Sequence, residues 1–199
     1  MKYALLVQPA FDKPTSIQAK FFMSILNNVV NLGKLHNIAT VTLFGEKANI
    51  DEFRLAIAKY DPVLVYFGGH GVETAIYGNS DPLILLGYNQ WLLRDRIVYA
   101  FNCRSVSVLG RMSQAKAVIG YDKEFLIYND ERYLPVFFNL GFRPLLLLYQ
   151  GYTVKKVYES TLNLYKYYLT RVALPDDIKE VIEYNYESFN AYGDPNARL

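Results

Sequence analysis

Two residues with chemically useful side chains, His70 and Cys103, each follow a short hydrophobic run of the chain. His70 lies in "YFGGHGVE" (66–73), and Cys103, the only cysteine, lies in "VYAFNCRS" (98–105). A thiol has a pKa of about 8.5 and needs a basic or cationic neighbour to become a strong nucleophile at neutral pH. An imidazole can take that proton and later protonate a leaving amine. The pair therefore indicates nucleophilic catalysis, provided that the two side chains meet.

Both residues are expected at the carboxyl edge of a parallel sheet. Continuous apolar runs are typical of parallel strands whose two faces are covered by helices. In open sheets of this kind, ligands bind beyond the carboxyl ends of the strands. If the strands before His70 and Cys103 are neighbours, the two side chains approach each other there. The predicted strands are Tyr3–Val7, Ala39–Phe44, Val63–Phe67, Ile97–Phe101 and Ala117–Gly120.

Helical spacing of apolar residues between these strands predicts an α/β fold. Strand and helix alternate, which favours a three-layer sandwich with a mostly parallel central sheet flanked by helices. We expect a single domain over residues 1–199, with a helical C-terminal part over 153–199. The predicted helices are Ser16–Leu35, Ile50–Tyr60, Ser105–Gln114, Leu134–Phe138, Thr153–Val172 and Pro175–Asn190.

The glycines beside His70 suggest a backbone role. Gly68, Gly69 and Gly71 permit positive φ and leave room for a substrate chain. The N–H groups of Gly71 and of Cys103, which we expect to open the following helix, are candidates to hold a developing oxyanion.

At these residues the sequence resembles the caspase-like cysteine peptidases, a group that includes caspases, gingipains, separase, legumain and CHAT domains. The resemblance rests on "VLVYFGGHG" followed by "IVYAFNCRS". Three downstream segments are also similar to CHAT and gingipain-like patterns: "CRSVSVLGRMSQAKAVIGYDKEF", "YQGYTVKKVYEST" and "YGDPNARL". The resemblance therefore extends over roughly Tyr3 to Leu199. It implies a caspase-hemoglobinase fold and a Cys–His dyad. His70 matches the family histidine, Gly71 the glycine after it, and Cys103 the nucleophile.

The sequence also departs from the family pattern. Caspases carry Gln-Ala-Cys-x-Gly, whereas this chain has Phe-Asn-Cys-Arg-Ser, so specificity for aspartate is not implied. Asn102 replaces the commoner small residue before the cysteine. The chain has no long linker between subunits, so we do not expect activation by cleavage into two subunits.

The leading hypothesis is a cysteine endopeptidase, and two alternatives stay open. A lone cysteine is most often a buried small hydrophobe, and a lone histidine is usually structural. The first alternative, which the compact single chain and the unusual Asn102 favour, is a catalytically silent caspase-like domain that serves as a recognition or scaffold module. The second is a flavodoxin-like protein that binds a small molecule.

Three acidic residues are candidates for a substrate pocket. Asp122 and Glu124 follow the fifth predicted strand, and Glu73 lies close to His70. Asp122 and Glu124 would form an acidic pocket that selects Lys or Arg, and Glu73 would orient His70 or line that pocket, although solvated surface charge is the plainer interpretation of all three. The chain shows no paired-carboxylate signal, no Gly-x-Ser-x-Gly elbow and no phosphate-binding loop.

Composition excludes several other classes of protein. A net charge of +2 argues against a dedicated nucleic-acid binder. One cysteine and two histidines make a zinc site improbable, and we expect no metal or cofactor. The single cysteine suits a reducing compartment, so a cytoplasmic location is expected. The apolar stretches are too short for a membrane span. The expected partner is a peptide or protein substrate, and the oligomeric state is not determined by the sequence.

Overall fold

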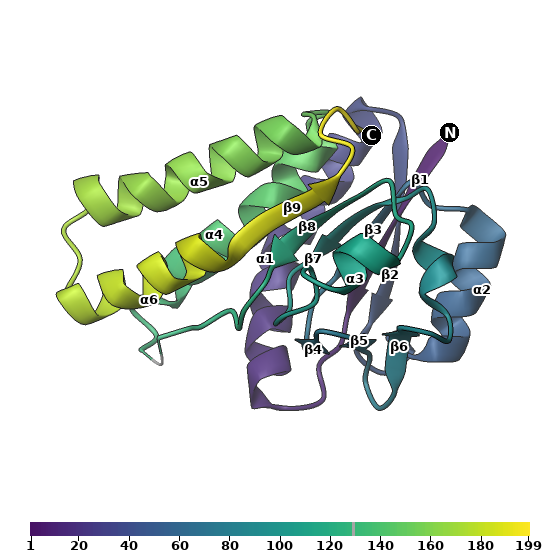
Figure 1. The fold of residues 1–199 in the computed structure, drawn as a ribbon, viewed down its shortest axis with the longest axis horizontal. Helices are drawn as coiled ribbons and strands as arrows, with labels where there is room; N and C mark the ends of the chain where they lie inside the picture. The colour runs from purple at the N-terminus through teal and green to yellow at the C-terminus, as the bar shows by residue number, and fades with distance from the viewer. Residues whose placement is uncertain (129) are drawn as a thin grey trace.

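A six-stranded sheet forms the centre of the computed structural model, which describes residues 1–128 and 130–199 (Figure 1). Its strand order is β2-β1-β3-β7-β8-β9, and every neighbouring pair is parallel except β8 with β9. All five predicted strands are present, so the expected mostly parallel sheet is confirmed. The strands are β1 (Lys2–Gln8), β2 (Ile38–Phe44), β3 (Leu64–Phe67), β7 (Ile97–Ala100), β8 (Ala117–Tyr121) and β9 (Phe189–Gly193).

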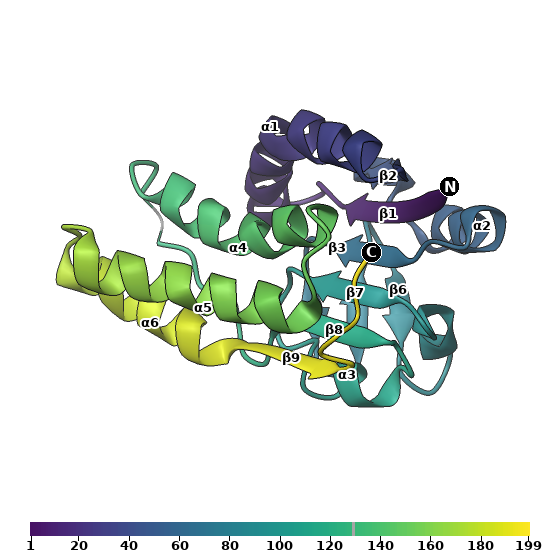
Figure 2. The ribbon, with the colours of Figure 1, turned by 90° about the horizontal axis from the view of Figure 1, so that it is seen from above.

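Helices cover both faces of this sheet (Figure 2). One face packs against α1 (Lys13–Leu35), α4 (Leu134–Tyr149), α5 (Val154–Arg171) and α6 (Asp176–Ser188). The other packs against α2 (Ile50–Tyr60) and the short α3 (Leu109–Met112). Successive strand residues point to opposite faces. In β3, for example, Leu64 and Tyr66 enter the first core, whereas Val65 and Phe67 enter the second. Both faces are therefore apolar, which explains the continuous hydrophobic runs of the sequence.

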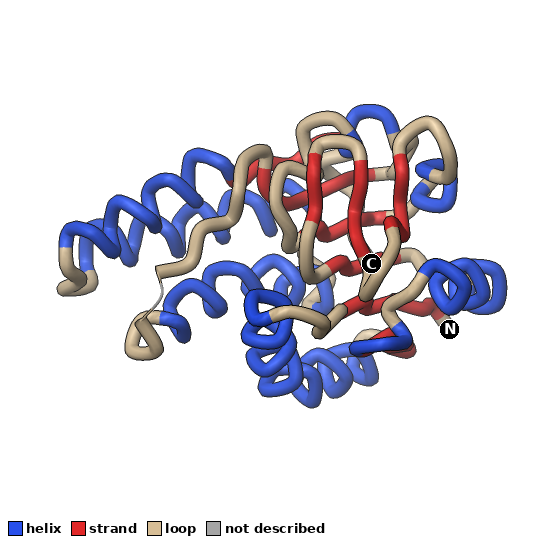
Figure 3. The backbone as a smooth tube through the Cα atoms, turned by 90° about the horizontal axis from the view of Figure 1, so that it is seen from below, coloured by secondary structure: helices blue, strands red, loops and turns tan. Residues whose placement is uncertain are grey.

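A small antiparallel sheet follows His70, in a stretch for which the sequence predicted neither a strand nor a helix. Figure 3 shows it in front of the central sheet when the molecule is seen from below. Strands of two to four residues carry too short a pattern to be distinguished from loops. The strands are β4 (Gly71–Val72), β5 (Ala75–Tyr77) and β6 (Pro82–Leu85), and two short 3-10 turns are η1 (Gly45–Lys47) and η2 (Gln90–Leu93).

Several helix ends differ from the prediction. α1 begins at Lys13 because Asp12 caps it: the Asp12 carboxylate accepts from Thr15 N–H at 2.9 Å. α4 continues through Pro144 as far as Tyr149, since burial of its apolar face outweighs the cost of the proline. α6 ends at Ser188, and the next residues form β9 on the edge of β8. Among the described helices, none has an apolar segment long enough to span a bilayer.

Candidate active site

His70 and Cys103 line the same cavity, whose volume is about 170 Å³. Each residue lies three positions beyond the end of its strand, and these strands, β3 and β7, are parallel neighbours with Phe67 opposite Ala100. The sheet register therefore places the two residues at the same level along the strand direction. The hydrogen bonds of the described residues include none between the Cys103 thiol and the His70 ring. The cavity is also lined by Pro14, Thr15, Gln18, Gly69, Phe101, Asn102, Phe125 and Ile127.

The His70 ring is held by Asp12, a residue that the sequence reasoning missed. His70 Nε2 lies 2.7 Å from Asp12 Oδ2, and the Phe11 ring packs against the imidazole in a T-shaped arrangement. Burial by itself would raise the pKa of Asp12, but hydrogen bonds from Thr15 and His70 hold that pKa below its usual value. Asp12 is therefore an anion at neutral pH. The signal in the sequence was Asp-Lys-Pro-Thr, the pattern of a helix start, which begins four residues after the end of β1.

The Cys103 thiol is partly buried, and burial raises its pKa. The backbone N–H of Phe125 offsets part of this shift. Two neighbouring charges act on the thiol in opposite directions: Glu124 raises its pKa and Arg104 lowers it. At neutral pH the thiol is protonated, so it needs a base to react.

An ion pair beside Cys103 joins the loop after β7 to the loop after β8. Arg104 pairs with Glu124, which also accepts a hydrogen bond from the Tyr184 hydroxyl at 2.9 Å. A backbone bond from Arg104 N to Lys123 O at 3.0 Å adds to this connection. Hydrogen bonds from its own backbone, Arg104 and Tyr184 keep the pKa of Glu124 low. The Glu124 carboxylate therefore already has partners within the protein.

The three acidic candidates do not line the cavity. Asp122 accepts hydrogen bonds from the Asn190 amide at 2.8 Å and the Tyr192 hydroxyl at 3.1 Å. Glu73 is exposed, and its charge acts on Arg104. An acidic pocket built from Glu73, Asp122 and Glu124 stays a prediction that no contact to the cavity supports.

The glycines near His70 serve the packing of the protein itself. Among Gly68, Gly69 and Gly71, only Gly69 has a positive φ, of 90°. A Cβ at Gly71 would lie 2.7 Å from Cys103 O, so the two loops are in contact at this point. Positive φ is therefore used at Gly69 alone of the three, and a Cβ at Gly71 would collide with the loop after β7.

Cys103 does not open a helix, and the helix predicted over Ser105–Gln114 is confined to Leu109–Met112. The helix that follows it, α3, begins only at Leu109, and residues 102–108 form bends and turns. Arg104 has φ 53°, a left-handed conformation that interrupts a right-handed helix. In the same segment, the Ser105 hydroxyl donates to the side-chain oxygen of Asn102. If the Cys103 N–H contacts an oxyanion, it does so from a turn and not from the first turn of a helix.

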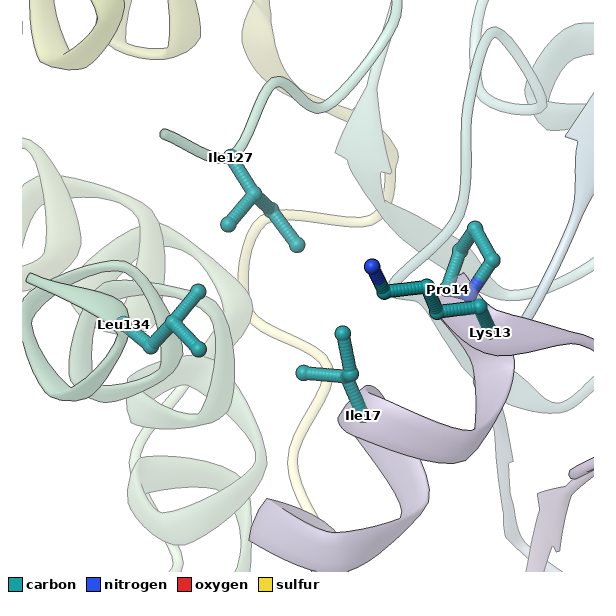
Figure 4. A pocket seen from close by; sticks show the side chains of 5 residues that line it. All are labelled: Lys13, Pro14, Ile17, Ile127 and Leu134. Atoms are coloured by element: carbon teal, nitrogen blue, oxygen red, sulfur yellow. The ribbon is translucent and has the colours of Figure 1, made fainter. Parts of the chain in front are cut away.

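A second, apolar pocket of about 250 Å³ adjoins this cavity and shares Pro14 and Ile127 with it. Figure 4 shows Ile17, Ile127 and Leu134 around the pocket, with the Lys13 ammonium extending toward it. Across residues 1–128 and 130–199, no cluster of three His, Cys, Asp or Glu side chains is arranged to hold a metal ion.

Comparison with solved structures identifies the fold. The crystal structure of the Arg specific cysteine proteinase gingipain R matches 99% of this chain, with a TM-score of 0.61 and 16% identity. The chain has the gingipain fold. The complex of Porphyromonas gingivalis RgpB pro- and mature domains also matches 99% of the chain, with a TM-score of 0.62 and 15% identity. This chain spans about half the length of either gingipain chain, 47% and 48%.

The gingipain fold confirms the expected caspase-hemoglobinase architecture and the resemblance to caspase-like cysteine peptidases at the level of the fold. No family model matches the sequence. No curated protein matches it. Likeness to CHAT domains in particular stays a prediction.

Proposed function

We propose that this chain is a cysteine endopeptidase with Cys103 as the nucleophile and His70 as the general base. One observation carries the proposal: both side chains line one cavity, at the carboxyl edge of the sheet, in a gingipain fold. That edge is where such sheets bind ligands. The presence of the Asp12 carboxylate behind the imidazole supports the assignment, because it is the arrangement that orients a catalytic base.

In the proposed reaction, His70 takes the thiol proton and the sulfur of Cys103 attacks the carbonyl carbon of a peptide bond. The negative charge that develops on the carbonyl oxygen is held by the backbone N–H groups of Gly71 and Cys103. The imidazolium, stabilised by Asp12, then protonates the amine as the C–N bond breaks, which leaves a thioester on Cys103. A water molecule, deprotonated by His70, attacks this thioester, releases the acid product and restores the thiol.

The apolar pocket beside the cavity favours a substrate with an apolar side chain near the cut bond. An engineered apolar cavity of about 150 Å³ holds benzene, so a pocket of about 250 Å³ has room for Leu, Met or Phe. The Lys13 ammonium at this pocket repels Lys and Arg. Gingipain R is Arg specific, and the earlier prediction that Glu73, Asp122 and Glu124 select a basic residue would give the same preference here. The apolar pocket thus predicts a preference for apolar side chains, whereas the acidic pocket predicts a preference for basic ones.

The decisive experiment is incubation of the purified chain with a mixed peptide library, beside Cys103→Ala and His70→Ala. Wild-type cleavage that both substitutions abolish would support the proposal, and equal cleavage by all three proteins would end it. His36→Ala is the matched control, because His36 is the other histidine and lies exposed at the end of α1. The residues found next to the cut bonds decide between apolar and basic specificity.

A catalytically silent recognition module is the second candidate function. It is favoured by the raised pKa of the Cys103 thiol and by the lack of a hydrogen bond from that thiol to His70 among the described residues. Alkylation by iodoacetamide separates the two candidates. A silent module predicts that His70→Ala leaves the alkylation rate of Cys103 unchanged, whereas the peptidase predicts a slower reaction.

A further inference from the structure

Gln18 connects the two loops that carry His70 and Cys103. Its side chain projects from the second turn of α1, is only 7% exposed and lies in the wall of the cavity. Its Nε2 donates to Phe101 O at 2.9 Å, two residues before Cys103. Its Oε1 accepts from Gly69 N–H at 2.5 Å, one residue before His70. One amide therefore bonds to the backbone of both loops.

We propose that Gln18 is a positioning residue that sets the separation and orientation of His70 and Cys103. This inference rests on the proposed peptidase function, since it concerns how the same two groups are aligned. Reacting groups must be held close to their productive geometry, and a displacement of about 1 Å can cost about 100-fold in rate. The ends of β3 and β7 are also joined by the hydrogen bond from Phe101 N–H to Phe67 O at 2.8 Å, and Gly71 packs against Cys103 O. The Gln18 amide crosses from one to the other.

An amide side chain suits this position. The site needs one hydrogen-bond donor for Phe101 O and one acceptor for Gly69 N–H, and Gln offers both on a side chain long enough to reach them. A carboxylate supplies no donor at neutral pH. An aliphatic side chain supplies neither, and it leaves two backbone groups without that partner.

A second buried amide fixes which way the Gln18 amide points. Gln8, fully buried at the end of β1, donates from Nε2 to Gln18 Oε1 at 3.2 Å. The Tyr66 hydroxyl donates to Gln8 Oε1 at 3.0 Å, so the Gln8 amide is itself oriented. Gln18 Oε1 thus accepts from two donors, and its Nε2 is directed to Phe101 O. A buried network with these groups satisfied is rigid, as alignment of a catalytic pair requires.

The test compares Gln18→Leu with Asn89→Leu. Asn89 is a matched control, because it is 3% exposed and its amide also joins two backbone groups, accepting from Leu85 N–H and donating to Leu83 O. It lies in the turn between β6 and η2 and does not line the cavity. We expect both variants to lower the melting temperature. Only Gln18→Leu should lower kcat, by about 10- to 100-fold, with a smaller change in KM.

The effect of His70 on the reactivity of Cys103 gives a second measurement, which would not change if Gln18 only stabilised the fold. In the wild type, His70→Ala should slow alkylation of Cys103 by iodoacetamide. In the Gln18→Leu background the same substitution should have at most a twofold effect, because the imidazole is no longer aligned with the thiol. If Gln18→Leu does not fold, Gln18→Glu replaces it; Glu keeps the acceptor for Gly69 N–H, loses the donor to Phe101 O, and should show an intermediate loss.

The outcomes separate the inference from the proposed function. An active wild type with equal kcat in the Gln18 and Asn89 variants, or with His70–Cys103 coupling unchanged by Gln18→Leu, overturns the role of Gln18 alone. A wild type that cleaves no peptide, and whose Cys103 alkylation is insensitive to His70→Ala, overturns the peptidase and the role of Gln18 together.

Discussion

Asp12 Oδ2 lies 2.7 Å from His70 Nε2, although the two residues are 58 positions apart in the chain. The contact joins the start of α1 to the loop after β3. Asp12 uses its other oxygen, Oδ1, to cap α1 by accepting from Thr15 N–H. One carboxylate therefore fixes both the helix start and the imidazole, and Gln18, less than two turns further along the same helix, bonds to the loops around them.

Replacing Asp12 by Asn isolates the effect of its charge. Asn caps a helix about as well as Asp, so the melting temperature should change little. Without the carboxylate the imidazolium loses its stabilising partner, and we expect kcat/KM to fall by about 100-fold or more. Asp177→Asn is the control, because Asp177 accepts a hydrogen bond from the Tyr128 hydroxyl at 2.6 Å on the surface. Full activity of Asp12→Asn would show that His70 needs no partner.

The charges beside Cys103 predict how its reactivity depends on pH. Burial raises the pKa of the thiol, so alkylation should accelerate as the pH rises above the range of an ordinary cysteine. Glu124 raises this pKa and Arg104 lowers it. Glu124→Gln should therefore shift the alkylation profile to lower pH, and Arg104→Gln should shift it to higher pH. The profile is measured by iodoacetamide labelling and mass spectrometry, and shifts in the same direction for both variants would contradict this account.

Gly69→Ala should destabilise the protein more than Gly87→Ala. Both glycines have similar positive φ, 90° and 83°, so the backbone strain of an alanine is about equal. A Cβ at Gly69 would lie 2.4 Å from Pro9 Cγ, whereas nothing lies within 4 Å of one at Gly87. We expect a difference of about 1–3 kcal/mol in the free energy of unfolding, the usual cost of overpacking. Urea denaturation measures this difference. Equal losses of stability in the two variants would mean that Pro9 moves aside at no cost.

A carboxylate in the apolar pocket should change the substrate preference. Ile17→Asp places a negative charge beside Lys13, which should lower cleavage after Leu and raise cleavage after Arg. Ile25→Asp is the control, since Ile25 lies on the same helix and lines a groove that shares none of the cavity's residues. Ratios of kcat/KM for Leu and Arg peptides give the result. An unchanged ratio in Ile17→Asp would exclude this pocket from substrate binding.

The sequence predicted those elements whose pattern is local. Buried parallel strands are continuous apolar runs, so the core of the sheet was found within one or two residues of its ends. The helix over Ile50–Tyr60 was found with its observed bounds, because its apolar face is periodic; in the structure Asn49 caps its start. β9 was missed, since its residues continue the pattern of α6 and become a strand only by pairing with β8.

The sequence alone determined the α/β architecture and the placing of His70 and Cys103 beyond the ends of strands, because hydrophobic periodicity and glycine positions are properties of neighbouring residues. Only the tertiary structure decided that β3 and β7 are adjacent in register and that Asp12 reaches His70. It also decided that Gln18 bridges Gly69 and Phe101, and that Glu124 pairs with Arg104. These are polar contacts between distant segments, and their partners are selected by the packing of the whole sheet and its helices.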